Sequence, residues 1–181
     1  KDTKLTPRIA ETAKFLFFVY VCLTVACGFS YWLAGMTPFD AISHSFTTVA
    51  TAGFSTHDAS MGYFDSQPIL IVSTLFMILG GFNFALHYYT FAQLITGRQP
   101  FGRWSVWKVS LRKFTLLHYW RESEARLFMA LILGSTVIVC AALLLSDRYD
   151  LQESFYNGLF TTVSVITTTG YGTDAFSEWP L

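Results

Sequence analysis

The strongest constraint on the fold of this chain comes from three long apolar segments that contain no charged residue. They are Phe15 to Met36, Pro68 to Leu94 and Leu127 to Ser146. A helix rises about 1.5 Å per residue, so about 20 residues are enough to cross a hydrocarbon core about 30 Å thick. Charged residues make up only 13% of the chain, about half the share that is usual in soluble domains. The sequence therefore predicts an all-α membrane protein with three membrane-spanning helices.

Two further apolar segments are too short to cross a membrane. They are Pro38 to Ala50 and about Leu151 to Ile166, and the shorter one covers only about 20 Å as a helix. Each is followed by a stretch rich in threonine and glycine, Ala50 to Thr56 and Thr167 to Thr173. These residues favour non-helical backbone, which a membrane tolerates only where protein or water covers it. We therefore expect two pore helices that enter the membrane and return through a loop.

The charged residues predict how the chain is oriented in the membrane. Segments 1–14 and 97–126 hold eleven of the twelve basic residues and four acidic ones, whereas 37–67 and 147–181 hold one basic and eight acidic residues. The positive-inside rule then places the N-terminus and the 97–126 loop in the cytoplasm, and both pore helices enter from the outside. The tryptophans of the 97–126 loop favour an anchor at the lipid headgroups, with a docking surface for a cytosolic partner as the alternative.

The order of span, pore helix, glycine-containing loop and span occurs once in full and then begins again, which indicates an internal repeat. Aligning the loops on Gly53 and Gly170 pairs Thr51 with Thr168, whereas a rival alignment of 46–49 with 160–163 leaves the glycines unpaired. We prefer the glycine alignment because few residues can replace glycine where φ is positive. Since the second unit is incomplete, we expect a longer polypeptide. The expected organisation is a cytoplasmic segment at 1–14, a complete unit at 15–96, a cytoplasmic basic and aromatic loop at 97–126, and the first span and pore loop of the next unit at 127–181.

The two loops have the composition of a monovalent cation site. A pore helix that enters from outside turns its C-terminal end, with its partial negative charge, toward the centre of the membrane. The carbonyl oxygens of the following loop need a partner there, and a dehydrated K⁺ ion is one that rings of carbonyls can bind. Neither loop has a carboxylate at its centre, which disfavours a divalent ion. The expected K⁺ ligands are Thr51, Ala52, Gly53 and Phe54 in the first loop and Thr168, Thr169, Gly170 and Tyr171 in the second.

The loop motifs also resemble those of a known family. The run Thr-Thr-Thr-Gly-Tyr-Gly at 167–172 resembles the filter sequence of potassium channels, whereas Thr-Ala-Gly-Phe-Ser at 51–55 keeps one glycine. Unequal loops within one chain, each on a repeated span, pore helix and filter loop, are similar to the Trk/Ktr/HKT superfamily of potassium transporters. The resemblance is closest to the second repeat and most of the third repeat of the bacterial Trk-type potassium uptake membrane subunit. It is also carried by segments 41–46, 53–60 and 80–87.

The resemblance implies the architecture and function of a larger assembly. Four unequal repeats in one polypeptide would surround a single pore in the bacterial inner membrane, and Gly53 and Gly170 would be the key glycines of the second and third repeats. It further implies a homodimer and a cytosolic nucleotide-binding regulatory ring. The implied function is potassium uptake through a selectivity filter, either channel-like or as a symporter with a coupling ion.

Two other functions stay open at this stage. A homotetrameric potassium channel is disfavoured because the two loops differ, and a membrane anchor or assembly subunit would carry no ions. An enzyme is not favoured, because no nucleophile, base or paired carboxylates occur at useful spacing. The cysteines lie in apolar segments and are typical of small buried side chains, and we expect Asn83 and His87 to form hydrogen bonds between helices. The histidines lack the spacing of a metal site: His44, His57, His87 and His118.

Overall fold

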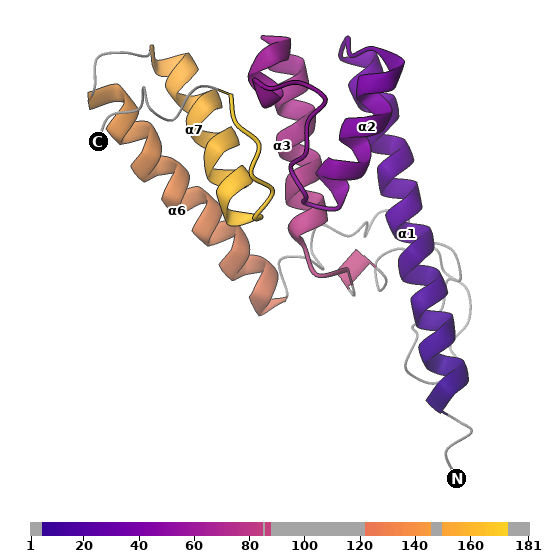
Figure 1. The fold of residues 1–181 in the computed structure, drawn as a ribbon. Coiled ribbons are helices and arrows are strands. Elements are labelled where there is room, and N and C mark those ends of the chain that lie inside the picture. The colour runs from indigo at the N-terminus through magenta and orange to yellow at the C-terminus, as the bar shows by residue number, and fades with distance from the viewer. Residues whose placement is uncertain (1–4, 85, 88–121, 146–149, 174–181) are drawn as a thin grey trace, which may run out of the picture.

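The computed structural model describes residues 5–84, 86–87, 122–145 and 150–173, with side chains from residue 13 onward (Figure 1). Its elements are α1 (Leu5–Leu33), α2 (Pro38–Val49), the short 3-10 helix η1 (Ser60–Phe64), α3 (Gln67–Gly81), α6 (Ser123–Leu145) and α7 (Leu151–Ile166). All regular structure in this part of the chain is helical, which confirms the predicted all-α fold class. Most of the predicted 97–126 loop and residues 88–94 of the second expected span lie outside the described residues.

Helices α1 and α6 are long and apolar enough to cross a membrane, in agreement with the first and third predicted spans. The apolar segments are Ala13–Leu33, with 21 residues, and Ser123–Leu145, with 23. Only 22% of the most apolar stretch of α1 and 17% of that of α6 is buried, so neither resembles the core helix of a soluble protein. Large apolar side chains such as Val25 and Ile138 are exposed. An apolar surface of this extent requires lipid or further protein against it.

The second predicted span, Pro68 to Leu94, is interrupted within the described residues. Helix α3 ends at Gly81, and Phe82 adopts an extended conformation (φ −69°, ψ 149°) before helical backbone resumes at Phe84. The 15 residues of α3 cover only about 22 Å. Within the described residues the predicted span is therefore not one continuous helix, and α3 ends at the glycine pair Gly80 and Gly81.

Tight packing surrounds this break. A methyl group at Gly80 would lie 2.8 Å from the carbonyl oxygen of Val49, and one at Gly81 would lie 2.9 Å from Cγ2 of Thr167. Val49 ends α2 and Thr167 follows α7, so the end of α3 contacts the C-terminal ends of both pore helices. The two glycines permit this approach because they have no side chain.

The polar residues beyond the break form hydrogen bonds of two kinds. Asn83 Nδ2 donates to Glu124 Oε2 of α6 at 3.3 Å, which agrees with the expected bond between helices. His87 Nε2 donates to the carbonyl oxygen of Leu79 at 2.8 Å, across the break. That carbonyl belongs to the last turn of α3, whose oxygens have no partner within the helix.

Helices α2 and α7 begin and end close to where the sequence predicts the two pore helices. Thr37 caps α2, and Pro38 occupies its first position, where a missing N–H costs nothing. Asp150 caps α7 by accepting a hydrogen bond from the backbone nitrogen of Leu151 at 2.8 Å. Figure 1 shows both helices starting at the end of the structure opposite the N-terminus and turning back partway along the long helices.

The packing divides the described structure into two similar halves joined at the centre. Helix α2 packs on α1, α7 packs on α6, and α3 contacts α1, α2 and α7 (Figure 1). The side chains that meet between these elements are almost fully buried and include Tyr31, Met77, Val163 and Tyr171. The core thus lies directly behind the two loops that follow α2 and α7.

Candidate functional site

The two loops have the same backbone conformation. Thr51 and Thr168 have φ values of 49° and 59°, and Gly53 and Gly170 have φ values of 69° and 85°. A positive φ is unfavourable for a β-branched residue such as threonine, so the surrounding structure must hold it there. The conformations match residue for residue in the glycine alignment, which confirms that alignment over its rival.

The hydrogen bonds between each loop and its own pore helix also match. The carbonyl oxygen of Thr47 accepts from the backbone nitrogens of Ala52 at 2.8 Å and Gly53 at 3.4 Å. The carbonyl oxygen of Ser164 accepts from Thr169 at 2.9 Å and Gly170 at 3.2 Å. The loop amides therefore face their own helices.

Most carbonyl oxygens of the two loops have no hydrogen-bond donor among the described residues. Within the part of the chain that the structure describes, no donor contacts the carbonyls of 51–54 or 168–170. Oxygens without donors are costly to bury unless another partner binds them. The residues expected to bind K⁺ thus share the feature that a backbone cation site requires, with Tyr171 as the exception.

Tyr171 differs from the other predicted ligands because its polar groups are already engaged. Its carbonyl oxygen accepts a hydrogen bond from Ser164 Oγ at 2.8 Å, and its side chain is only 1% exposed. Its hydroxyl lies 2.6 Å from Thr47 Oγ1 and 3.1 Å from Thr48 Oγ1 on α2. Tyr171 thus braces the second loop against the first pore helix. Phe54, at the matching position of the first loop, is 75% exposed.

A chain of hydroxyl groups continues from Tyr171 into the core. Thr48 Oγ1 also lies 2.8 Å from the hydroxyl of Tyr31, which is completely buried in α1. The chain connects the first long helix, the first pore helix and the second loop. Sequence reasoning used Thr47 and Thr48 only in the rival alignment, although hydroxyl residues in an apolar helix were an available signal.

The two loops touch each other. A methyl group at Gly53 would come within 1.8 Å of the carbonyl oxygen of Thr169, whereas one at Gly170 would meet nothing within 4 Å. Gly53 is therefore required for both its positive φ and its close contact, and Gly170 for its positive φ alone.

The segment after the first loop contacts the second loop. The backbone nitrogen of Gly62 donates to the carbonyl oxygen of Gly172 at 3.2 Å, and the nitrogen of Gly172 donates to Ser60 Oγ at 3.3 Å. A methyl group at Gly62 would lie 2.0 Å from the carbonyl oxygen of Thr173. Helix η1 of the first unit is therefore bonded to the second loop. The sequence pattern did not reveal this contact.

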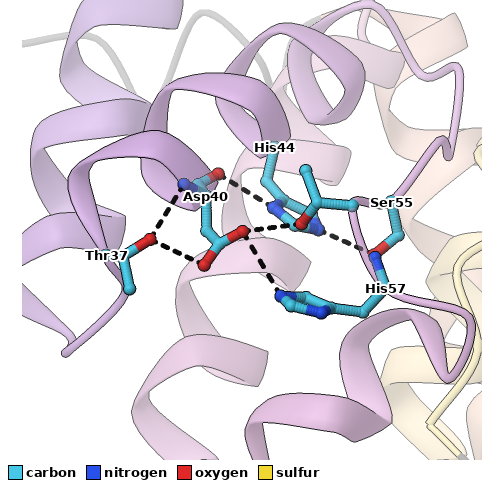
Figure 2. Close-up of polar contacts among 6 residues, drawn as sticks. Thr37, Asp40, His44, Ser55 and His57 are labelled. Carbon is cyan, nitrogen blue, oxygen red and sulfur yellow. Dashed lines mark hydrogen bonds and ion pairs between the residues drawn. The ribbon is translucent and has the colours of Figure 1, made fainter.

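A polar cluster at the start of α2 contacts the far end of the first loop (Figure 2). Asp40 Oδ1 accepts from Thr56 Oγ1 at 2.6 Å, and Asp40 Oδ2 accepts from Thr37 Oγ1 at 2.7 Å. His44 Nε2 lies 2.9 Å from Ser55 Oγ. None of these residues was singled out as functional from the sequence, because their spacing matches no known ligand or catalytic motif.

His57 completes this cluster. Its Nε2 lies 3.3 Å from Asp40 Oδ1, and its ring stacks on Tyr63 with 3.5 Å between centroids. The contact with Asp40 thus ties the segment that follows the first loop to the start of the pore helix, and the ring stacking packs His57 on η1.

Comparison with known proteins finds relatives that match this chain along its whole length. Residues 1–181 match the TrkH family model, described as a cation transport protein. The chain is 47% identical to the Trk system potassium uptake protein TrkH of Vibrio parahaemolyticus, covering 100% of this chain and 34% of that protein. It is 42% identical to the protein of the same name from Escherichia coli K12, covering 100% of this chain and 34% of the relative.

A solved structure agrees with the fold. The crystal structure of the potassium transporter TrkH from Vibrio parahaemolyticus superposes with a TM-score of 0.82 at 44% identity, covering 97% of this chain and 34% of that one. The chain thus spans about a third of the length of the relatives it matches. With the family model matched from residue 1 to residue 181, the chain belongs to the TrkH family of cation transport proteins.

Proposed function

We propose that this chain forms part of the pore of a potassium uptake transporter and that its two loops provide two sectors of the selectivity filter. The observation that carries the proposal is the pair of loops with matching backbone, whose carbonyl oxygens at 51–54 and 168–170 have no donor in the described part of the chain. The names of the relatives, which are potassium uptake proteins, support potassium as the transported ion.

The proposed ligands bind K⁺ through backbone oxygens that replace its hydration shell. They are Thr51, Ala52, Gly53, Phe54, Thr168, Thr169 and Gly170. Tyr171 holds the second loop in place, because its carbonyl oxygen and hydroxyl already have partners. The C-terminal ends of α2 and α7 add partial negative charge beside the same loops. Since no carboxylate lies among the ligands, the site suits a monovalent cation.

The repeat relation supports a pore of more than two units. Tyr171 of the second unit docks on Thr47 and Thr48 of the unit before it. Phe54 occupies the matching position and is exposed, so we propose that it docks on the pore helix of a unit that precedes this one. The proposed organisation keeps a unit at 15–96 and the start of the next at 127–181.

The remaining proposals concern orientation and assembly. Segments 1–14 and 97–126 lie on the cytoplasmic side of the inner membrane, because they hold most of the basic residues. The functional protein is a homodimer that binds a cytosolic nucleotide-binding regulatory ring, as the family resemblance implies. Transport is either channel-like or coupled to a second ion.

The experiment that tests the filter uses the full-length protein in liposomes. We expect Gly170→Ser to lower the preference for K⁺ over Na⁺ in uptake assays by about tenfold, because a side chain at a positive φ costs roughly 1–2 kcal/mol and reshapes the loop. Folding should be retained, since space for a side chain is open there. Unchanged ion preference in a well-folded variant would falsify the filter assignment.

A further inference from the structure

The polar cluster at the start of α2 lies outside the proposed filter, yet it contacts the end of the first loop. We propose that Asp40 and His44 are positioning residues that hold this loop in its ion-binding shape, so that cation selectivity depends on two side chains that touch no ion. The proposal rests on the filter function proposed above for residues 51–54.

Asp40 and His44 bond to Thr56 and Ser55, and we call this set of contacts the clamp. The carboxylate of Asp40 is its centre. Asp40 is only 7% exposed, and its oxygens accept from Thr37 and Thr56 and lie beside His57. An ionised carboxylate only accepts hydrogen bonds, so donors on both oxygens match the charged form. Hydrogen bonds to a charged acceptor are stronger than neutral ones. The short bond to Thr56 is therefore a firm attachment for the chain just beyond the filter.

The imidazole of His44 supplies a second attachment with a defined direction. His44 is completely buried, and its Nδ1 lies 2.8 Å from the carbonyl oxygen of Asp40. A carbonyl can only accept, so Nδ1 carries the proton and Nε2 accepts from the hydroxyl of Ser55. The same hydroxyl oxygen accepts from the backbone nitrogen of His57 at 3.1 Å. Each donor in this series of hydrogen bonds thus has one acceptor, so all the bonds run in one direction and fix the positions of the groups that form them.

These contacts tie both ends of the first loop to one helix. The start of the loop is held by the carbonyl oxygen of Thr47, which accepts from Ala52 and Gly53. The end is held by Ser55 and Thr56, the two residues that follow the last proposed ligand. Because α2 fixes both ends, the carbonyls between them have little freedom to move. Ligands held by such supporting contacts are the ones that keep a fixed geometry.

The second loop lacks this clamp. In the repeat alignment, Asn157 takes the place of Asp40, and Thr161 takes that of His44. Gly172 and Thr173 stand where the first loop has Ser55 and Thr56. The buried hydroxyl of Thr173 has no hydrogen-bond partner among the described residues. Thr173 is therefore a matched control for Thr56, identical in type and in repeat position.

The test compares three variants of the full-length protein in liposomes, with uptake of K⁺ measured alone and in competition with Na⁺. Thr56→Val keeps the shape of the side chain and removes the hydroxyl. We expect the preference for K⁺ over Na⁺ to fall about tenfold or more, the effect of losing one hydrogen bond to a charged acceptor. The KM for K⁺ should rise, with little change in the maximal rate. Thr56→Ser should restore both values, and Thr173→Val should leave them unchanged.

Each outcome decides the proposal. Thr56 is exposed, so its variants should fold. Ser55→Ala removes the other attachment of the end of the first loop to α2. Wild-type selectivity and KM in both Thr56→Val and Ser55→Ala would overturn the clamp, as would an equal effect of Thr173→Val. Gly170→Ser in the same liposomes separates the two proposals. If Gly170→Ser alters selectivity and the clamp variants do not, only the clamp proposal is rejected. Absence of K⁺ uptake by the wild-type protein would reject the filter proposal as well.

Discussion

The two loops adopt one backbone conformation but are held by different parts of the molecule. The first loop is held by its own pore helix, through Asp40 and His44. The second loop is held largely by the other unit, since Tyr171 bonds to α2 and Gly172 bonds to Ser60 of η1. Matching φ values at the paired threonines and glycines show that the backbone itself is the shared element. The comparison teaches that the backbone hydrogen bonds from each loop to its own pore helix are repeated, whereas the side-chain contacts that hold the loops are not.

The same difference affects the paired glycines. Gly53 is pressed against the second loop, while the position of a side chain at Gly170 is open. One glycine therefore carries a packing requirement that its counterpart lacks.

The largest effect is expected from Gly53→Ala compared with Gly170→Ala. The first variant combines a positive φ with a methyl group 1.8 Å from a carbonyl oxygen, so we expect loss of both folded protein and K⁺ uptake. The second has only the positive φ, at roughly 1–2 kcal/mol, so it should fold with reduced ion selectivity. Yield of monodisperse protein in detergent and uptake in liposomes measure the two effects. The same yield and the same uptake in both variants would contradict the proposed difference between the two glycine positions.

A smaller effect is expected from Gly62→Ala. The methyl group would meet the carbonyl oxygen of Thr173 at 2.0 Å, so η1 must move away and the bonds to Gly172 must weaken. We expect ion selectivity to fall while the protein stays folded, because η1 is a short element that can shift. Ala59→Gly, in the same segment, is the control and should leave selectivity at the wild-type value. Uptake of K⁺ against Na⁺ in liposomes provides the measurement.

The smallest effect is expected from Tyr171→Phe. The ring remains buried, and only the hydroxyl contacts with Thr47, Thr48 and the carbonyl oxygen of His44 are lost. Such a loss costs about 1 kcal/mol, which should lower the thermal unfolding midpoint by a few degrees and the K⁺ preference by no more than about threefold. Phe54→Leu, at the matching position of the first loop, removes an aromatic ring without removing a hydroxyl bond and serves as the comparison. An unchanged unfolding midpoint in Tyr171→Phe would show that the hydroxyl bridge between the units is dispensable.

Much of the site could be anticipated from residue types alone. Apolar segments of limited length, followed by threonine and glycine, predict the bounds of α2 and α7 to within a residue. Glycine at Gly53 and Gly170 predicts the positive φ values that the structure contains. These features are local, because helix length and backbone freedom depend on residues adjacent in the chain.

The clamp and the braces were not predictable in the same way. Asp40 and Thr56 are 16 positions apart, and Tyr171 bonds to residues more than 120 positions away. No periodicity or motif relates residues at such separations, because their contact depends on how the helices pack. The break in α3 belongs to the same class, since Gly80 and Gly81 are explained by their contacts with the ends of α2 and α7.

By itself, the sequence determined the long helices α1 and α6, the pore helices α2 and α7, where the two loops lie and which glycines correspond, because apolar length and backbone freedom are properties of neighbouring residues. Tertiary structure alone decided how each loop is held: the first by a carboxylate and an imidazole of its own helix, the second by hydroxyl and amide groups of the other unit. The physical reason is that polar groups at the loops are satisfied by whichever partner the helix packing brings within hydrogen-bond distance.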